Sequence, residues 1–226
     1  MSHVTRPWIR QPIFFLDFEG SRASGILEYG MVVVQDGRVT TTKTRLCRPT
    51  GRVRPEDIAI HGLEPRMLAG SALISEDWEL FAGWREQGPF AAHYAGVENA
   101  LLKSVWPYPR SSPDFARPGE QVVEWGPWID SARLYAQLHP GHDSGNLQFL
   151  VAAHGLQAEL DALAVEHCPP DRRGYHAALY DALAGALLLV GLARHPRHSE
   201  LSLGRLLAMS TLDPDKRDDL MQGRLL

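Results

Sequence analysis

Cysteine is scarce in this sequence, with Cys47 and Cys168 the only two among 226 residues. Two cysteines cannot build the disulfide framework of a small secreted protein or a four-cysteine zinc site, so we expect a protein of a reducing, cytoplasmic compartment. Long hydrophobic runs are also missing. The longest, residues 182–193, is too short to cross a bilayer and is typical of a buried helix. Residues 1–12 show no apolar segment of a secretory signal, and we expect no membrane partner.

An excess of basic residues is likewise absent, since 23 lysines and arginines face 27 acidic residues and give a formal net charge of −4. This excludes a protein that coats nucleic acid with a uniformly basic surface, because such binding depends on many contacts from Lys and Arg to phosphates. An enzyme that holds only a strand end is compatible with this charge, since bound divalent cations change the local balance. With 44% hydrophobic residues, the chain can bury one full globular core.

Three β-rich segments open the sequence. Residues 13–16 form a short apolar run that ends at Asp17 and is typical of a buried central strand. Residues 26–34 and 38–47 are two further runs, and the Asp36-Gly37 pair between them is a strong signal for a tight hairpin turn. We predict three antiparallel strands at the start of the fold.

Helical and strand signals alternate along the rest of the chain. We predict a helix over residues 76–86, whose Trp78, Phe81 and Trp84 recur at helical spacing and favour core positions. We also predict a short helix within 55–68, a strand at 90–93, a long surface loop at 106–128 with a closing strand within 122–129, and helices at 97–105, 131–138, 147–153 and 175–192. This order predicts a mixed α/β sheet. We assign residues 1–193 to one domain and residues 194–226, with helices at 201–209 and 214–221, to a C-terminal extension that packs on it.

Asp17 and Glu19 carry the first chemical signal. They lie two residues apart at the end of a predicted strand, so strand alternation directs both carboxylates to the same side. Carboxylate oxygens are the ligands that Mg²⁺ prefers in proteins, and this pair could hold such an ion. Taken alone, the spacing is more often that of a solvated strand end.

Two later elements add an acid and a histidine–acid pair. Glu98 stands near the start of a predicted helix, where a carboxylate can also simply complement the helix dipole. His176 and Asp181 are five residues apart, and five helical steps turn a side chain by about 500°. Both can face one point only if His176 precedes the helix and Asp181 lies inside it. A buried helical Asp is costly unless it is paired or binds a metal, which favours a functional Asp181.

Taken in this order, the three elements resemble the motifs of the DEDDh family of 3′→5′ exonucleases (DnaQ-like, RNase H-like), which includes the polymerase III proofreading subunit, RNase T and oligoribonuclease. The resemblance begins with the Phe-Leu-Asp-Phe-Glu-Gly segment at 15–20, continues through Ala-His at 92–93 to Glu98, and ends at His176 and Asp181, covering about residues 13–192. The Ile-His-Gly-Leu segment at 60–63 and the Ile-Asp-Ser segment at 129–131 are similar to further family landmarks. The resemblance implies an RNase H-like mixed five-stranded sheet flanked by helices, with its first three strands antiparallel.

The resemblance also implies a reaction. Five side chains would form the active site: Asp17, Glu19, Glu98, His176 and Asp181. The four carboxylates among them would hold two Mg²⁺ or Mn²⁺ ions, which stabilise the attacking and leaving oxygens of an in-line displacement at phosphorus. His176 would take a proton from the attacking water. The expected activity is release of 5′-mononucleotides from free 3′ ends of nucleic acid, with DNA favoured over RNA.

Substrate contacts follow from the same resemblance and concern four residues: Gly20, Ser21, His61 and Tyr94. Gly20 would allow close backbone approach to the terminal nucleotide. His61 would lie near the terminal bases, although a loop histidine that caps a turn explains it equally well. Six basic residues and no acid occupy positions 37–55, a run that we interpret as a solvated face rather than a phosphate track.

Three other histidines, His93, His154 and His167, share no zinc-ligand spacing, and we interpret them as structural or surface residues.

Two positions depart from the family pattern. Glu98 stands where the family carries Asp, and Tyr94 stands where it carries Asn, although Tyr can still hydrogen-bond or stack. One alternative is an RNA 3′ exonuclease of the same family, because that choice rests on 2′-hydroxyl contacts. Another is a nucleic-acid-binding module with an impaired site, a hypothesis that Glu98 motivates. Retention of acid or histidine chemistry at all five positions favours the enzyme. The sequence indicates no particular protein partner.

Overall fold

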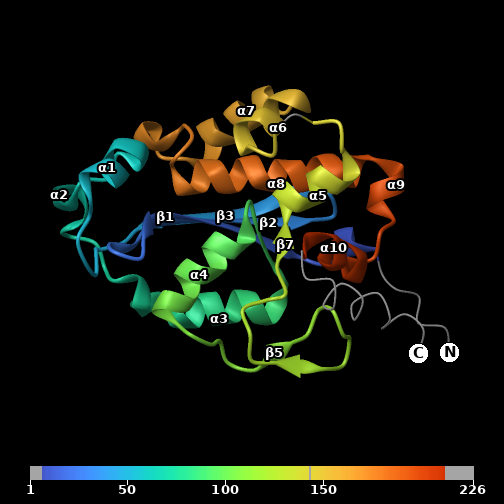
Figure 1. The fold of residues 1–226 in the computed structure, drawn as a ribbon, viewed down its shortest axis with the longest axis horizontal. Coiled ribbons are helices and arrows are strands. Elements are labelled where there is room, and N and C mark those ends of the chain that lie inside the picture. The colour runs from blue at the N-terminus through green and yellow to red at the C-terminus, as the bar shows by residue number, and fades with distance from the viewer. Residues whose placement is uncertain (1–6, 143, 212–226) are drawn as a thin grey trace.

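The computed structural model describes residues 7–142 and 144–211 (Figure 1). Its main sheet has five strands in the order β3-β2-β1-β4-β7. The strand bounds are Ile13–Ser21 (β1), Gly25–Gln35 (β2), Arg38–Leu46 (β3), Phe90–Ala92 (β4) and Ile129–Asp130 (β7). Strands β1, β2 and β3 are antiparallel, whereas β4 runs parallel to β1 and β7 parallel to β4. The predicted mixed sheet with three antiparallel opening strands is confirmed.

Strand β1 is longer than the apolar run predicted, because it continues past Asp17 to Ser21. Its pairing with β2 reaches Ser21 opposite Gly25, so the hairpin partner satisfies the backbone of this extension. On its other edge, β1 pairs with β4 at Phe14 and Phe15. Asp17 therefore lies just beyond the point where β4 ends.

The turn between β2 and β3 is the one that Asp36-Gly37 predicts. Both residues have positive φ, 51° and 70°, which a two-residue type I′ turn requires. The pairing of Gln35 with Arg38 closes the hairpin directly across this turn. The prediction of a tight hairpin is confirmed.

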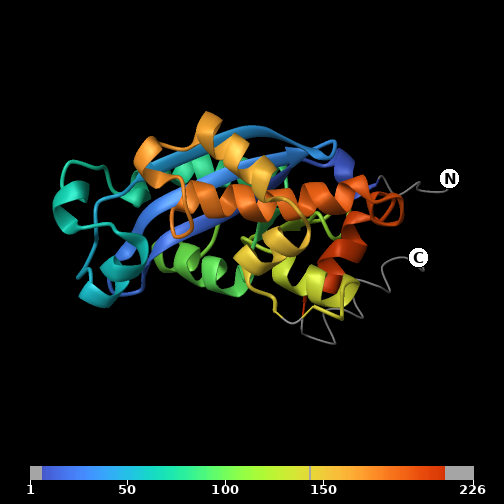
Figure 2. The same ribbon diagram turned by 90° about the horizontal axis from the view of Figure 1, so that it is seen from above.

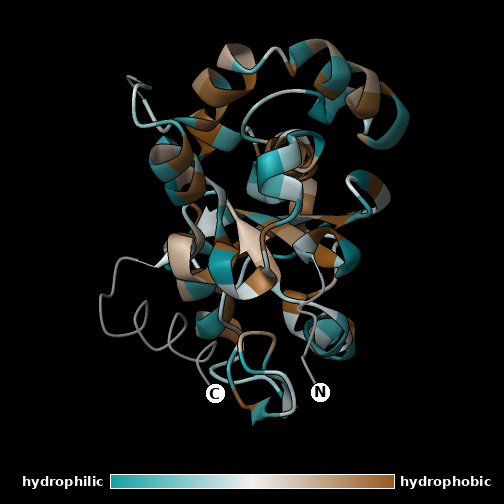
Figure 3. Ribbon diagram, turned by 90° about the vertical axis from the view of Figure 1, so that its right-hand side faces the viewer, coloured by the Kyte–Doolittle hydropathy of each residue, from teal (hydrophilic) through white to brown (hydrophobic). Residues whose placement is uncertain are grey.

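Helices cover both faces of the sheet (Figures 1 and 2). Helix α8 (Ala178–Arg194) packs across β1, β2 and β3 on one face, and α6 (Leu147–Ala153) and α7 (Gln157–His167) pack on α8. Helices α3 (Trp78–Gln87) and α4 (Ala95–Val105) lie on the opposite face. The remaining helices are α1 (Pro55–His61), α2 (Pro65–Leu68), α5 (Ser131–Leu138), α9 (Pro196–Ser199) and α10 (Leu203–Ser210). Figure 3 shows hydrophobic parts of the sheet lying between the helices that cover its two faces.

Strand alternation divides the core into two parts. Ile13 and Phe15 of β1 are buried in the cluster that α8 dominates, whereas Phe14 and Leu16 are buried with the aromatic residues of α3. Trp78, Phe81 and Trp84 of α3 lie in or against that second cluster, as their spacing predicted. The side of β1 that faces α8 is therefore also the side on which its later residues, Asp17 and Glu19, must lie.

Several predicted bounds can be compared with the structure. The helices predicted at 131–138 and 147–153 coincide with α5 and α6, whereas α7 was not predicted. The prediction of a surface loop at 106–128 was wrong in part. This segment contains a short hairpin of Ser112–Pro113 (β5) and Gln121–Val122 (β6), and it buries Trp106 and Trp125 in the aromatic cluster. Each indole ring has a large apolar surface, and its burial stabilises the fold.

The C-terminal segment packs where β7 meets α5. Ser210 Oγ of α10 accepts a hydrogen bond from the Asp130 amide (3.0 Å), and Gln137 of α5 donates to the Met209 carbonyl. Helix α10 matches the helix predicted at 201–209, and the helix predicted at 214–221 lies outside the described residues. The division into a domain of residues 1–193 and an extension of 194–226 remains a prediction. Among the described residues, no helix combines the length and apolar character needed to cross a membrane.

Candidate active site

Asp17 and Glu19 lie on the same side of β1, facing the start of α8. Their cross-strand neighbours on β2 are Gly30 and Glu28. Gly30 has a specific packing role, because a Cβ atom there would lie 2.2 Å from the carbonyl oxygen of Ala178. The absence of a side chain at Gly30 lets the first residue of α8 approach the sheet directly opposite Asp17. This approach brings Asp181, in the first turn of α8, close to the strand carboxylates.

His176 lies in the turn before α8, and Asp181 lies inside that helix, as their spacing required. The helix begins at Ala178 rather than at residue 175 because His176 adopts a left-handed φ of 66°. The Asp181 Oδ2 atom accepts a hydrogen bond from the His176 amide at 2.8 Å. Possible ligand atoms of Glu19, His176 and Asp181 all lie within 4.8 Å of one another. Glu19 and Asp181 are buried in this group, and His176 is exposed.

Glu98 reaches the same region from the opposite face of the sheet. It lies in the first turn of α4, and its Oε2 atom accepts a hydrogen bond from the Phe18 amide at 3.0 Å. Because β4 ends before this point, the carboxylate replaces a strand as the partner of that amide. The Asp130 carboxylate fixes the start of α4 by accepting a hydrogen bond from the Ala95 amide at 3.1 Å. A Cβ at Gly96 would meet nothing within 4 Å, so the room for Glu98 does not depend on that glycine.

Burial raises the pKa of all four carboxyl groups. It raises the pKa of Glu19 and of Glu98 to about 8, and that of Asp181 to about 7. The pKa of Asp17 is raised well above its usual range, first by desolvation and then by the negative charges of Glu98 and Asp181. The amides of Phe18 and His176 oppose this effect, since each donates to a carboxylate and lowers its pKa. The four acids thus form one mutually repelling, poorly solvated group.

A divalent cation fits this arrangement. The Asp181 Oδ1 atom is buried and has no hydrogen-bond partner in the part of the chain that the structure describes. An unpaired buried acceptor is costly, and so is a set of crowded negative charges. Oxygen ligands that converge in this way suit Mg²⁺ or Mn²⁺.

Glu28 and Arg172 belong to the site although the sequence analysis did not single them out. Glu28 is buried and Arg172 is partly buried, and their side chains form an ion pair. The Glu28 Oε2 atom also accepts a hydrogen bond from the Ala178 amide at 3.1 Å. Arg172 donates further to the carbonyls of His61 (2.6 Å) and His176 (3.0 Å). The pair therefore ties the turn that carries His176 to the sheet. An acid within the apolar β2 run was the available sequence signal, because such an acid needs a partner.

The four residues predicted to contact substrate have different surroundings. Gly20 has a φ of 133°, and a Cβ there would lie 2.2 Å from the Gly25 carbonyl, so the irregular pairing of β1 with β2 already requires a glycine. The Ser21 hydroxyl bonds to Ser24 and to the Asp57 carboxylate. These contacts are internal to the protein and explain both residues without a substrate.

His61 and Tyr94 retain groups that are available to a ligand. The His61 ring is buried at the end of α1, where Nδ1 accepts from the Leu63 amide at 3.0 Å and Nε2 has no partner among the described residues. The interpretation of His61 as a turn cap is therefore correct for one nitrogen. Tyr94 is 51% exposed at the start of α4, and its ring packs against His93. Both ring nitrogens of His93 are hydrogen-bonded, which agrees with a structural role.

Known proteins resemble this chain in sequence and in fold. No family model matches the chain. In sequence, it is 27% identical over 168 residues to Exodeoxyribonuclease 10 of Escherichia coli (strain K12), an alignment that covers 74% of this chain and 61% of that protein. The chain thus spans less than two thirds of the length of this relative.

Two solved structures have similar folds. Exonuclease X in complex with 5′ overhanging duplex DNA superimposes with a TM-score of 0.59 and 22% identity, covering 86% of this chain and 99% of that chain. The nuclease domain of 3′hExo, a DEDDh family member bound to rAMP, gives a TM-score of 0.61 at 13% identity, covering 87% and 97%. These similarities confirm the RNase H-like fold and the resemblance to DEDDh, DnaQ-like exonucleases.

Proposed function

We propose that this chain, a relative of the DEDDh exonucleases, is a divalent-metal-dependent 3′→5′ exonuclease that removes 5′-mononucleotides from DNA ends. One observation carries the proposal: Glu19 and Asp181 bring ligand atoms within 4.8 Å of one another and of His176, and Asp17 and Glu98 lie close enough to both acids to raise one another's pKa. A structural role alone does not explain this grouping, since four crowded and poorly solvated acids repel one another and raise one another's pKa.

The proposed cofactor is a pair of Mg²⁺ or Mn²⁺ ions held by these four carboxylates. When bound, the ions would neutralise charge on the scissile phosphate and on the attacking and leaving oxygens. The carboxylates must lose their protons to bind a cation, so their raised pKa values couple metal binding to proton release.

His176 is the proposed general base. It is exposed, its backbone is fixed by Asp181 and Arg172, and a histidine can accept a proton from water near neutral pH. Its exposure allows the accepted proton to pass to solvent after each turnover. The hydrogen bond from the His176 amide to Asp181 keeps the base beside the carboxylates that would bind metal.

Recognition of the strand end is assigned to His61 and Tyr94. The unpartnered His61 Nε2 atom can hydrogen-bond to a base or sugar, and the exposed Tyr94 ring offers a stacking surface. DNA is the proposed substrate because Exodeoxyribonuclease 10 is named for it and the Exonuclease X structure contains it.

The proposal is tested with single strands of DNA and RNA labelled at either end, incubated with Mg²⁺, Mn²⁺ or EDTA. Shortening from the 3′ end, release of mononucleotides and inhibition by EDTA are expected, with DNA cleaved faster than RNA. The Asp17→Asn variant is the matched control, because it keeps the size of the side chain and removes a charge from the proposed metal site. A 3′-blocked or circular strand should resist cleavage.

Efficient cutting of circular strands would contradict the exonuclease assignment. Equal activity of the Asp17→Asn variant would remove these carboxylates from the mechanism. Faster cleavage of RNA would assign the same chemistry to the other nucleic acid.

A further inference from the structure

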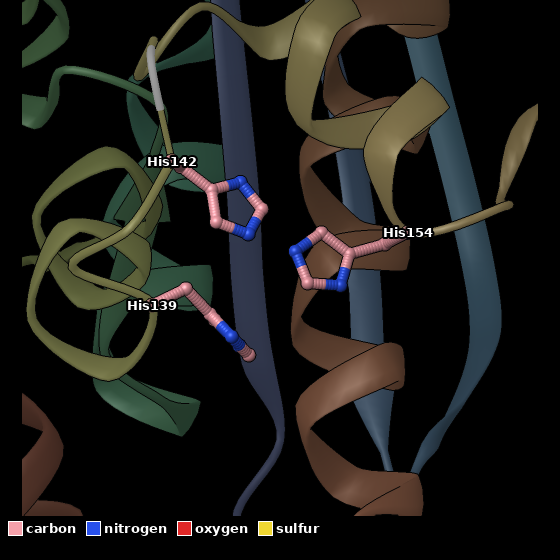
Figure 4. A group of neighbouring side chains, drawn as sticks. All are labelled: His139, His142 and His154. Carbon is pink, nitrogen blue, oxygen red and sulfur yellow. The ribbon is translucent and has the colours of Figure 1, made fainter.

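Three histidines gather at the far end of α8 from the proposed active site (Figure 4). His139 ends α5, His142 lies in the connection between α5 and α6, and His154 ends α6. Figure 4 shows the three rings directed toward one another across the space between these elements. The sequence analysis considered His154 without the other two, because eleven residues and a helix separate it from His142.

The rings are close enough to share one ion. The centroid of His154 lies 4.7 Å from that of His139 and 4.9 Å from that of His142. One nitrogen from each of the three rings falls within a group whose members are all within 4.8 Å of one another. Each ring is partly buried, so the group is neither a solvated surface patch nor a closed core.

Two nitrogens of this group lack partners. The buried His142 Nδ1 and His154 Nε2 atoms have no hydrogen-bond partner among the described residues. A set of histidines present only for packing is expected to satisfy its ring nitrogens, as both nitrogens of His93 are satisfied. Unpartnered nitrogens on rings this close together can bind a shared ligand.

An aromatic side chain packs beside this group at His139 and His154. The Tyr135 ring packs against the same two rings, at centroid distances of 5.3 Å and 4.8 Å, and restricts their orientation. A pocket of about 230 Å³ adjoins them and is lined in part by Leu156 and Gly191.

We propose that His139, His142 and His154 bind one divalent transition-metal ion of the Zn²⁺ class. Zinc bonds to histidine nitrogen at about 2.0–2.1 Å, which places tetrahedral ligand atoms about 3.3 Å apart. The nitrogens now lie within 4.8 Å of one another and the His142 and His154 rings are stacked at 7°, so binding requires these rings to turn. The described residues supply three ligands, and water completes the fourth position. The bound ion joins the ends of α5 and α6 through their connection and so stabilises this side of the fold.

This site is independent of the carboxylates. Asp181 and Gly191 are ten residues apart on α8, which corresponds to about 15 Å along a helix axis. The chemistry differs as well, since Mg²⁺ prefers oxygen ligands whereas imidazole suits Zn²⁺. Zn²⁺ can also bind carboxylates, and the test must therefore remove that contribution.

The test uses the full-length Asp17→Asn/Asp181→Asn variant as background, stripped with EDTA and titrated with ZnCl₂ by calorimetry. One equivalent of Zn²⁺ is expected to bind and to raise the melting temperature. Adding His139→Ala, His142→Ala or His154→Ala should weaken binding by at least about 100-fold, because loss of a mere partner of a ligand already costs about 10–100-fold. His167→Ala is the matched control, since His167 lies outside the group, and should bind like the background.

Melting curves in EDTA identify any variant that fails to fold, and the remaining variants then decide the outcome. Titration with CoCl₂ gives a second readout, because the absorption spectrum of bound Co²⁺ reports tetrahedral nitrogen ligands in the background protein and should disappear in the His154→Ala protein. The proposal is overturned if the background binds no Zn²⁺, or if the three histidine variants bind it as tightly as His167→Ala.

Discussion

The carboxylate of Glu98 accepts a hydrogen bond from the backbone amide of Phe18, 3.0 Å away, where β1 extends beyond the end of β4. This contact gives Glu98 two roles that can be separated. It supplies an acceptor to an amide that has no strand partner, and it adds a negative charge beside Asp17 and raises the pKa of that group.

Substitutions at Glu98 separate these roles. Glu98→Gln keeps the acceptor and removes the charge, so we expect normal folding and severe loss of single-turnover cleavage in Mg²⁺. Glu98→Ala should be equally inactive and should also lose about 0.5–1.5 kcal/mol of unfolding free energy with the hydrogen bond. Glu98→Asp should retain only part of the activity. The charge is kept, but the shorter side chain would have to span the same gap to β1.

Two outcomes of the Glu98 experiment would contradict this account. Wild-type cleavage by Glu98→Ala would mean that Glu98 only complements the dipole of α4. An inactive wild type together with an active Glu98→Asp would identify the natural chain as a binding module with an impaired site.

The fold was predictable where the signal is local. The Asp36-Gly37 turn and the buried run at 13–16 follow from neighbouring residues, and both agree with the structure. The acids of the candidate site were identified because their order along the chain resembles a known family. Their separate spacings were too common to identify a site.

Contacts between distant residues could not be predicted in this way. Glu28 and Arg172 are 144 positions apart, and only the fold shows that the arginine neutralises the buried acid. The same holds for Trp125, which was placed in a loop because its segment is rich in Pro, Gly and Ser but is fully buried in the structure. A single sequence indicates that a buried charge or ring needs a partner without indicating which residue provides it.

His176→Ala should reduce the single-turnover rate by about 10²–10⁴-fold, the usual contribution of a positioned general base. Because the bond to Asp181 comes from the backbone amide, the substitution leaves that contact in place, and Mg²⁺ affinity should change little. At saturating Mg²⁺, the wild type and the variant should also differ in how their rates depend on pH. The same pH profile in both proteins would assign proton removal to another group.

Arg172→Met should destabilise the protein by about 3–5 kcal/mol, because it leaves the buried Glu28 without its counter-charge among other acids. Adding Glu28→Gln should recover much of this loss, since glutamine can still accept from the Ala178 amide. Urea unfolding of the two single variants and the double variant gives the coupling energy of the pair. Additive effects of the two substitutions would show that the ion pair does not hold the His176 turn.

The raised pKa values of the site also fix the sign of a pH effect on stability. In metal-free protein, folded Glu19 and Glu98 keep protons up to a pKa of about 8, whereas their ordinary value is 4.5. Asp17 is shifted in the same direction. The stability that these protons provide is complete below the unfolded pKa values and is lost as pH rises through the folded ones. Buried histidines such as His93, whose pKa is lowered, have the opposite effect. The stability that they contribute to the folded protein is lost as pH falls.

Comparing wild type with Asp17→Asn cancels the histidine contribution, because both proteins contain the same histidines. In EDTA, the melting temperature of Asp17→Asn minus that of the wild type should increase as pH rises from about 5 to about 8. The variant lacks one of the carboxyls that lose their protons in this range. Excess MgCl₂ should raise the melting temperature of the wild type more at pH 8 than at pH 5, because fewer protons have to be displaced from the carboxyls at higher pH. It should have little effect on the melting temperature of the variant. Parallel pH curves for the two proteins in EDTA would show that Asp17 titrates near its ordinary pKa, and an equal response of both to Mg²⁺ would show that it does not hold the ion.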